Sequence, residues 1–190
     1  MKKIITILTA IVLIFTLNIT AIANEILLSR DEIPLLREDS AEVALLHVLD
    51  ILRGTENGFE LDRTITRAEA VCLIFRMHPE NPGAIGMPSP EFEDLDGHWA
   101  YKEVTAAKKM GLIDGTGETT FHPDRVITGK EFTKILLTML KVRDVTIENA
   151  YSLGIDKGIL PDDFTKSVVY NNEKLLRSDA ARLCYAALTY

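Results

Sequence analysis

Apolar side chains in the middle of the chain recur at helical spacing and predict two short helices joined by a loop. Over residues 99–110 one face is formed by Val104, Ala107 and Met110, spaced as on the buried side of an amphipathic helix. A second helix is predicted to begin at Thr128, where a hydroxyl side chain precedes an apolar run. Its buried face is expected to consist of Phe132, Ile135, Leu136 and Met139.

This helix-loop-helix pattern occurs three times. Phe59 lies seven residues before Thr66, as Phe121 lies seven before Thr128, and residues 175–179 repeat the start of the second helix in a weaker third copy. One helix pair cannot bury its own apolar faces, so the copies are expected to pack together into a mainly all-α domain. The predicted organisation is a lead-in over residues 24–38, a first repeat over 39–78, a proline-rich linker over 79–91, a second repeat over 92–141 and a third, degenerate repeat over 142–190.

Residues 1–23 are predicted to be a secretory signal peptide rather than part of the fold. Two lysines are followed by an apolar run over residues 4–17 and by the small residues Ala21 and Ala23, a layout typical of cleavage after Ala23. The alternative is an uncleaved anchor, because this stretch is just long enough to span a bilayer. Asn18 and the neighbouring threonines weaken that alternative.

Charge and cysteine content narrow the class of protein. The net charge is −7 for the full sequence and becomes −9 once the signal segment, with its two lysines and no acid, is removed. Such an acidic chain is not expected to bind nucleic acid or an anionic membrane surface. Cys72 and Cys184 lie in apolar helical stretches and are expected to be buried free thiols. A disulfide between them is the alternative in an oxidising compartment, and their spacing is not that of a metal site.

Two tetrapeptides have the pattern of a helix capping box. Thr66 with Glu69, and Thr128 with Glu131, place a hydroxyl and a carboxylate three residues apart, so that each side chain binds the backbone amide of the other residue. This role explains the threonine and the glutamate but not Arg67, since a cation in the first turn of a helix opposes the helix dipole. A residue placed against its local preference is a candidate functional residue.

An ordered set of motifs runs through the second copy, and the first copy adds the tetrapeptide Thr66-Arg67-Ala68-Glu69. The motifs of the second copy are Phe92-Glu93-Asp94, Gly97-His98-Trp99-Ala100, Gly111-Leu112-Ile113-Asp114-Gly115, Phe121-His122-Pro123-Asp124 and Ile127-Thr128. Together they resemble the S-layer homology family, the cell-wall anchoring repeats of bacterial surface proteins. The resemblance covers roughly residues 39–188.

The resemblance implies three helix-loop-helix repeats packed as a pseudo-threefold helical domain on the outer surface of a bacterium. It also implies non-covalent binding to a secondary cell-wall polysaccharide, often one that carries pyruvate ketals on an amino sugar. In the family the signature arginine meets that carboxylate, and a tryptophan and an aspartate line the same kind of groove. We therefore expect Arg67, Asp94 and Trp99 to form one groove, with Lys130 and Arg177 as further candidate ligand contacts in the other copies.

The other copies depart from the family pattern. Gly129 replaces the signature arginine in the second copy, and Leu176 cannot cap the helix of the third. Copies one and three have Glu38 and Thr146 at about the tryptophan position. Replacing Arg67 by alanine is accordingly expected to weaken wall binding with little loss of stability, and replacing the third-copy arginine is expected to do less.

Two other classes of protein compete with this interpretation. An enzyme would need convergent chemistry, but the four histidines are scattered and no nucleophile triad, phosphate loop or metal cluster is apparent. No cofactor is therefore expected. The second competitor is a protein-binding module of the same fold whose wall-binding site has decayed, which the degenerate copies favour. Its partner would be another surface protein.

Overall fold

The computed structural model describes residues 41–79, 92–160 and 174–190, and within them the fold is helical. The helices are α2 (Ala41–Val48), α3 (Arg67–Met77), α4 (Tyr101–Lys109), α5 (Gly129–Met139), α6 (Ala150–Asp156) and α7 (Arg177–Thr189), with a short 3₁₀ turn η2 (Glu93–Leu95). No strand forms among these residues, only isolated β-bridges. The expectation of a mainly all-α fold is confirmed. The predicted signal peptide and lead-in lie outside the described residues, as does nearly all of the predicted linker.

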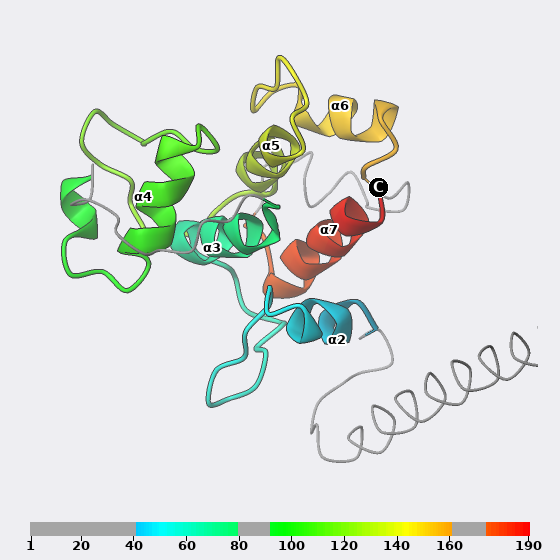
Figure 1. Cartoon of the computed structure of the whole chain (residues 1–190), viewed down its shortest axis with the longest axis horizontal. Coiled ribbons are helices and arrows are strands. Elements are labelled where there is room, and N and C mark those ends of the chain that lie inside the picture. Colours follow the sequence, from blue (N-terminus) through cyan, green and yellow to red (C-terminus); the bar gives the residue numbers. More distant parts are fainter. Residues whose placement is uncertain (1–40, 80–91, 161–173) are drawn as a thin grey trace, which may run out of the picture. The chain divides into compact units, whose positions relative to one another are not determined.

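The helices pair between predicted repeats rather than within them. The main contacts of the shorter helices are α4 with α3, α6 with α5 and α2 with α7 (Figure 1). The first helix of each repeat thus packs on the second helix of the preceding repeat, and the first repeat takes the third as its predecessor. The copies pack together as expected. They do so in a cycle, because each repeat pairs its first helix with the second helix of the repeat before it.

A closed ring of three backbone hydrogen bonds joins the segments that precede α3, α5 and α7. The amide of Ile65 donates to Leu175 O (3.0 Å), that of Leu175 to Ile127 O (3.1 Å), and that of Ile127 to Ile65 O (3.1 Å). All three side chains are fully buried, and the three helices also contact one another in pairs. The ring supports the expected pseudo-threefold packing, which stays a prediction for the chain as a whole.

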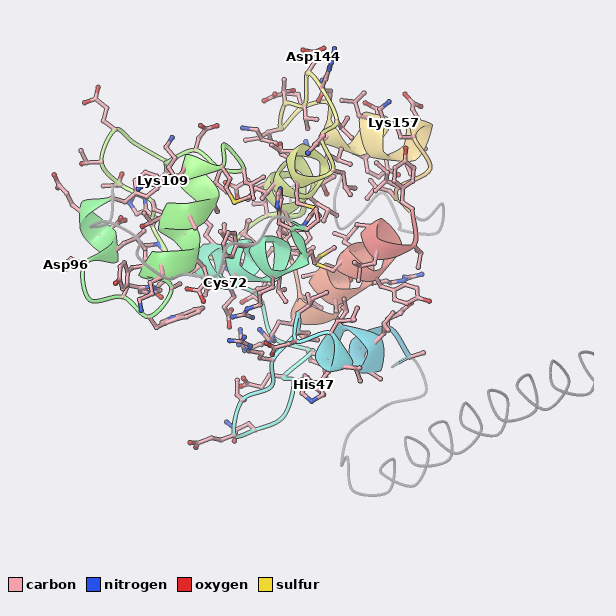
Figure 2. All side chains as sticks on the ribbon, viewed as in Figure 1. His47, Cys72, Asp96, Lys109, Asp144 and Lys157 are labelled. Atoms are coloured by element: carbon pink, nitrogen blue, oxygen red, sulfur yellow. The ribbon has the colours of Figure 1, made fainter. Side chains whose placement is uncertain are left out.

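Both cysteines are buried free thiols in this structure. Figure 2 shows Cys72 on α3, and Cys184 lies on α7. Burial raises the pKa of each thiol to about 12, so neither is a reactive thiolate at neutral pH. In the part of the chain that the structure describes, no helix is long and apolar enough to cross a membrane.

Candidate functional site

The two predicted capping boxes are present and set the start of the helices that carry the candidate arginines. Thr66 Oγ1 accepts from the amide of Glu69 at 3.3 Å, and the Thr66 amide donates to Glu69 Oε2 at 3.0 Å. Thr128 and Glu131 make the same pair of bonds, again at 3.3 and 3.0 Å. At α7 only half of the box can form, because Leu176 has no side-chain acceptor. Its amide still donates to Asp179 Oδ2 at 3.4 Å.

The cap glutamate of α3 also binds two arginines. Arg63 reaches Glu69 with two nitrogens, at 2.9 and 2.5 Å, and Arg177 Nη1 lies 3.4 Å from the same carboxylate. Burial opposes ionisation of Glu69, but hydrogen bonds from Arg63 and from the Thr66 amide outweigh it and hold its pKa below the ordinary value. The carboxylate is therefore a fixed anion around which the arginines are ordered.

Glu131 has the same surroundings at the start of α5. Arg125 Nη2 donates to Glu131 Oε1 at 2.5 Å, and Arg67 Nη1 lies 3.5 Å from that oxygen. Burial again opposes ionisation, and the arginine and the Thr128 amide again lower the pKa of the glutamate. Two copies of one charged arrangement thus exist, each built across a repeat boundary.

Arg67 points away from its own repeat and into the second. Its Nε donates to Phe121 O at 3.1 Å and its Nη2 to Asp114 O at 3.3 Å, while the guanidinium carbon lies 4.7 Å from the centre of the Phe121 ring. Only 5% of the residue is exposed, and burial lowers the pKa of the guanidinium, with Glu131 opposing. Neighbouring groups of the protein therefore already occupy this guanidinium.

Arg177 makes the equivalent contacts in the first repeat. Its Nε donates to Phe59 O at 2.9 Å and its Nη2 to Arg53 O at 2.8 Å, and it too is 5% exposed. The missing threonine cap does not disturb this geometry. The backbone of the first repeat fixes the position of Arg177 even though Leu176 cannot cap the helix.

A pocket of about 220 Å³ lies over Arg177, and we call it the Trp99 pocket. It is lined by Arg53, Gly54, Thr55, Glu69, Cys72, Leu73, Arg76, Trp99 and Arg177. Trp99 is 59% exposed and stands just before α4, whose packing on α3 carries it to the pocket. The His98 ring lies 5.4 Å from the indole and accepts from the Ala100 amide at 3.1 Å, which helps to fix the tryptophan.

A second pocket, of about 270 Å³, lies over Arg67, and we call it the Ile147 pocket. Its lining consists of Arg67, Leu112, Ile113, Asp114, Gly115, Thr116, Glu131, Lys134, Ile135 and Ile147. The segment before α6 in the third repeat contributes Ile147 to this pocket. In the Trp99 pocket the corresponding place is taken by the indole. The sequence had placed Thr146 at this position.

The two pockets differ in charge. The Trp99 pocket has three arginines against one glutamate. In the Ile147 pocket one arginine and one lysine face two acids, so the charges cancel. Lys134 Nζ lies 3.3 Å from Asp114 Oδ2, which further neutralises that lysine. An anionic ligand is therefore favoured by the Trp99 pocket.

The two pockets separate the residues of the predicted groove, Arg67, Asp94 and Trp99. Trp99 shares its pocket with Arg177, and Arg67 lines the other pocket. Asp94 fixes a loop: its carboxylate accepts from the Phe121 amide at 3.0 Å and from the His122 amide at 2.6 Å. Grouping residues by repeat could not anticipate this separation, since it ignores the exchange of partners between repeats.

Two further residues complete the comparison with the sequence. Lys130, predicted as a ligand contact, is not among the residues that line either pocket. Arg76 lines the Trp99 pocket and was not singled out. One signal was available, because its counterparts in the other repeats, Thr138 and Ala186, are uncharged.

Residues 91–133 match the S-layer homology domain family. Among curated relatives, a cellulosome-anchoring protein of Acetivibrio thermocellus is 32% identical over 93 residues, covering 47% of this chain and 21% of that protein. The exoglucanase XynX of the same organism is 32% identical over 146 residues, covering 73% of this chain and 12% of the relative. An S-layer protein of Bacillus thuringiensis subsp. finitimus is 22% identical over 152 residues, covering 72% and 18%.

The chain therefore carries an S-layer homology domain, as the motifs of the second copy predicted. It spans less than a quarter of the length of each of these relatives. A domain of this family, together with relatives named as surface and anchoring proteins, indicates a secreted protein associated with the bacterial cell wall.

Proposed function

We propose that this chain is a non-catalytic surface protein that binds a secondary cell-wall polysaccharide non-covalently through the Trp99 pocket. One observation carries the proposal: an exposed indole stands at a pocket with three arginines and one glutamate, in a chain whose net charge is −7. Long-range attraction of an anionic polymer is weak for such a chain, so binding depends on a local cationic site.

The chemistry of this pocket fits a sugar that carries a carboxylate, such as a pyruvate ketal on an amino sugar. An exposed indole offers a flat apolar face with a polar edge, on which a sugar ring can lie. A planar guanidinium matches a carboxylate with two parallel hydrogen bonds. We further propose that residues 1–23 direct secretion and that a lead-in, three S-layer homology repeats and a linker follow, with the boundaries given above.

The Ile147 pocket is proposed as a weaker second subsite. Arg67 lines it, and Lys130 follows the first residue of α5. We keep the prediction that Arg67 and Lys130 contribute to wall binding, through the positive charge that they place near this pocket. Asp94 is proposed to act indirectly, by ordering the loop that carries Phe121.

The test is a pull-down of the purified chain with isolated cell walls, before and after mild acid treatment that removes ketal-linked pyruvate. Trp99→Ala should weaken binding roughly tenfold or more, because stacking on an aromatic face is lost. Its melting temperature should barely change, since Trp99 is 59% exposed. Tyr190→Ala is the matched control, an aromatic residue 67% exposed and outside both pockets. Equal binding by wild type and Trp99→Ala would refute the assignment of this pocket.

A second candidate function is binding to another surface protein. The observation that favours it is an apolar ridge at the end of α2, where Leu45, Val48 and Leu49 are 40%, 74% and 50% exposed. Leu45 and Val48 lie three residues apart on α2 and Leu49 follows the helix directly, and exposed apolar side chains at such spacing form a contact surface for a protein partner. Capture of a defined surface protein in the absence of walls, with no retention on walls, would favour this function over polysaccharide binding.

A further inference from the structure

Arg76 occupies the last turn of α3 and lines the Trp99 pocket. It lies ten residues after the cap residue Thr66. The positions ten residues after the caps of α5 and α7 hold Thr138 and Ala186. Only the first repeat therefore places a cation at this point, and that helix forms the wall of the pocket that also holds the indole.

The three arginines of the Trp99 pocket differ in how far the protein uses their donors. Arg177 donates to Phe59 O and Arg53 O and pairs with Glu69. Arg53 forms a two-point pair with Asp50, with donor–acceptor distances of 2.8 and 2.6 Å.

Arg76 makes fewer contacts of this kind. Among the described residues its guanidinium has one hydrogen-bond acceptor, Ile51 O, which lies 3.2 Å from Nη1. A guanidinium has five N–H donors. Within that part of the chain, Arg76 has more uncommitted donors than either Arg53 or Arg177.

Ligand binding by Arg177 would carry a cost that binding by Arg76 avoids. To turn its fork toward a ligand, Arg177 would have to leave two carbonyl oxygens and a half-buried carboxylate. Acceptors left without a donor in a buried place oppose such a change. Arg76 can meet an anion while it keeps its hydrogen bond to Ile51 O.

We propose that Arg76 contacts the anionic group of the ligand that lies against Trp99, and that Arg177 is a positioning residue that builds the floor of the pocket. The proposal rests on the proposed function and specifies how the same pocket recognises its ligand. It assigns recognition of the anion to a residue outside the signature tetrapeptide, at a position where only one of the three repeats has an arginine.

The experiment measures equilibrium binding of the purified chain to isolated walls that retain their pyruvate and to the same walls after mild acid treatment. Arg76→Gln should weaken binding to native walls by roughly ten- to a hundredfold, the range for loss of a charge-assisted hydrogen bond. On treated walls this variant and the wild type should bind alike. Arg76→Lys should recover part of the affinity, because an ammonium lacks the planar fork.

Two controls separate recognition from structure and from net charge. Arg143→Gln removes the same charge from an exposed position outside both pockets and should stay within about twofold of wild type, as expected for a solvent-screened charge. Arg177→Gln should lower the melting temperature and reduce binding to both kinds of wall alike, as a positioning residue would. Arg76→Gln should lower the melting temperature much less than Arg177→Gln, since it loses one part-buried hydrogen bond, to Ile51 O, rather than three contacts.

The outcomes distinguish this proposal from the proposed function. If Arg76→Gln binds native walls as the wild type does while Trp99→Ala has lost binding, the pocket is right and the role of Arg76 is wrong. If Arg177→Gln keeps its melting temperature and loses only the pyruvate-dependent part of binding, the two arginines have the reverse roles. If the wild type does not distinguish native from treated walls and Trp99→Ala is neutral, the proposed function fails and the role of Arg76 fails with it.

Discussion

An arginine at the first position of a helix is unfavourable by itself, and the structure shows what compensates for it. Arg67 and Arg177 begin α3 and α7, where a cation meets the positive end of the helix dipole. Each guanidinium leaves its own helix and binds carbonyl oxygens of another repeat. A residue that looks misplaced in its own helix is therefore well placed in the assembled fold.

The sequence could single out Arg67 but not its partners. The acceptor carbonyls belong to Phe121 and Asp114, which lie 54 and 47 residues further along the chain. Every residue has a backbone carbonyl oxygen, so a sequence motif cannot indicate which residues accept these hydrogen bonds. The same argument applies to Arg177, whose two carbonyl acceptors lie 118 and 124 residues away.

The burial of these guanidinium groups changes the expected effect of removing them. Arg177→Ala would remove the donors of two carbonyl oxygens and one of the two arginines that pair with Glu69, and losing one partner of a buried pair typically costs about 3 kcal/mol of stability. The same reasoning replaces the expectation that Arg67→Ala would cost little. Denaturant unfolding measures the loss. Arg53→Ala is the control, since its ion pair with Asp50 is exposed and should contribute less than about 1 kcal/mol; equal losses would contradict a structural role for Arg177.

At the scale of elements, the periodicity located the helices but not their partners. The helix expected over residues 99–110 is α4, and the one expected after Thr128 is α5. An apolar face shows that a helix is buried on one side and does not say against what. The loop that joins two helices decides whether they can meet. Here the loops carry each first helix to the neighbouring repeat, and for that reason Arg67 and Trp99 line different pockets.

The capping boxes give a prediction about a single element. Thr128→Ala removes the acceptor for the Glu131 amide at the start of a helix whose Phe132 and Leu136 are fully buried. It should lower the free energy of unfolding by about 1 kcal/mol and shift Tm by about 2–4 °C. Thr119→Ala, on an exposed loop, should change neither. Loss of wall binding with an unchanged Tm would show that Thr128 acts on the ligand rather than on the helix.

At the scale of the whole molecule, the repeats meet where their helices begin. Ile65, Ile127 and Leu175 each precede a cap residue and form the closed hydrogen-bonded ring. The sequence aligned these three positions as equivalents. Equivalence does not imply contact, since repeats can also stack in a row. Closure of the ring is the step that only the structure supplies.

The acid at the third position of α3, α5 and α7 differs in charge environment among the three repeats. Arginines flank Glu69 and Glu131 and hold the pKa of each carboxyl below its ordinary value. Burial raises the pKa of Asp179, with the Leu176 amide and Arg182 opposing. No arginine fills the signature position ahead of it in the cycle, since Gly129 stands there. Two junctions are therefore stabilised by an ionised acid and the third is not.

This asymmetry predicts how stability depends on pH. For Glu69 and Glu131, whose pKa values are lowered in the folded state, the stabilisation is present above the ordinary glutamate pKa, about 4.5, and is lost as pH falls through the folded value. For Asp179, whose pKa is raised, the stabilisation is present below its ordinary value and is lost as pH rises through the folded one. Acidification removes the stabilisation from Glu69 and Glu131 and restores only that from Asp179. The free energy of unfolding should therefore fall between pH 5 and about pH 3.

Arg63→Gln tests which contacts produce this acid sensitivity. Arg63 makes two bonds to Glu69, so the variant should be less stable than the wild type by about 1.5–3 kcal/mol at pH 7. As pH falls through the lowered pKa of Glu69 in the folded wild type, the carboxyl becomes protonated and the difference should shrink toward zero. Urea unfolding at pH 7, 5, 4 and 3 measures both curves, with Arg143→Gln as the matched control that removes an exposed charge. A difference that stays constant across this range would show that Arg63 stabilises the fold through packing, and that the ionised cap acid does not hold the repeats together.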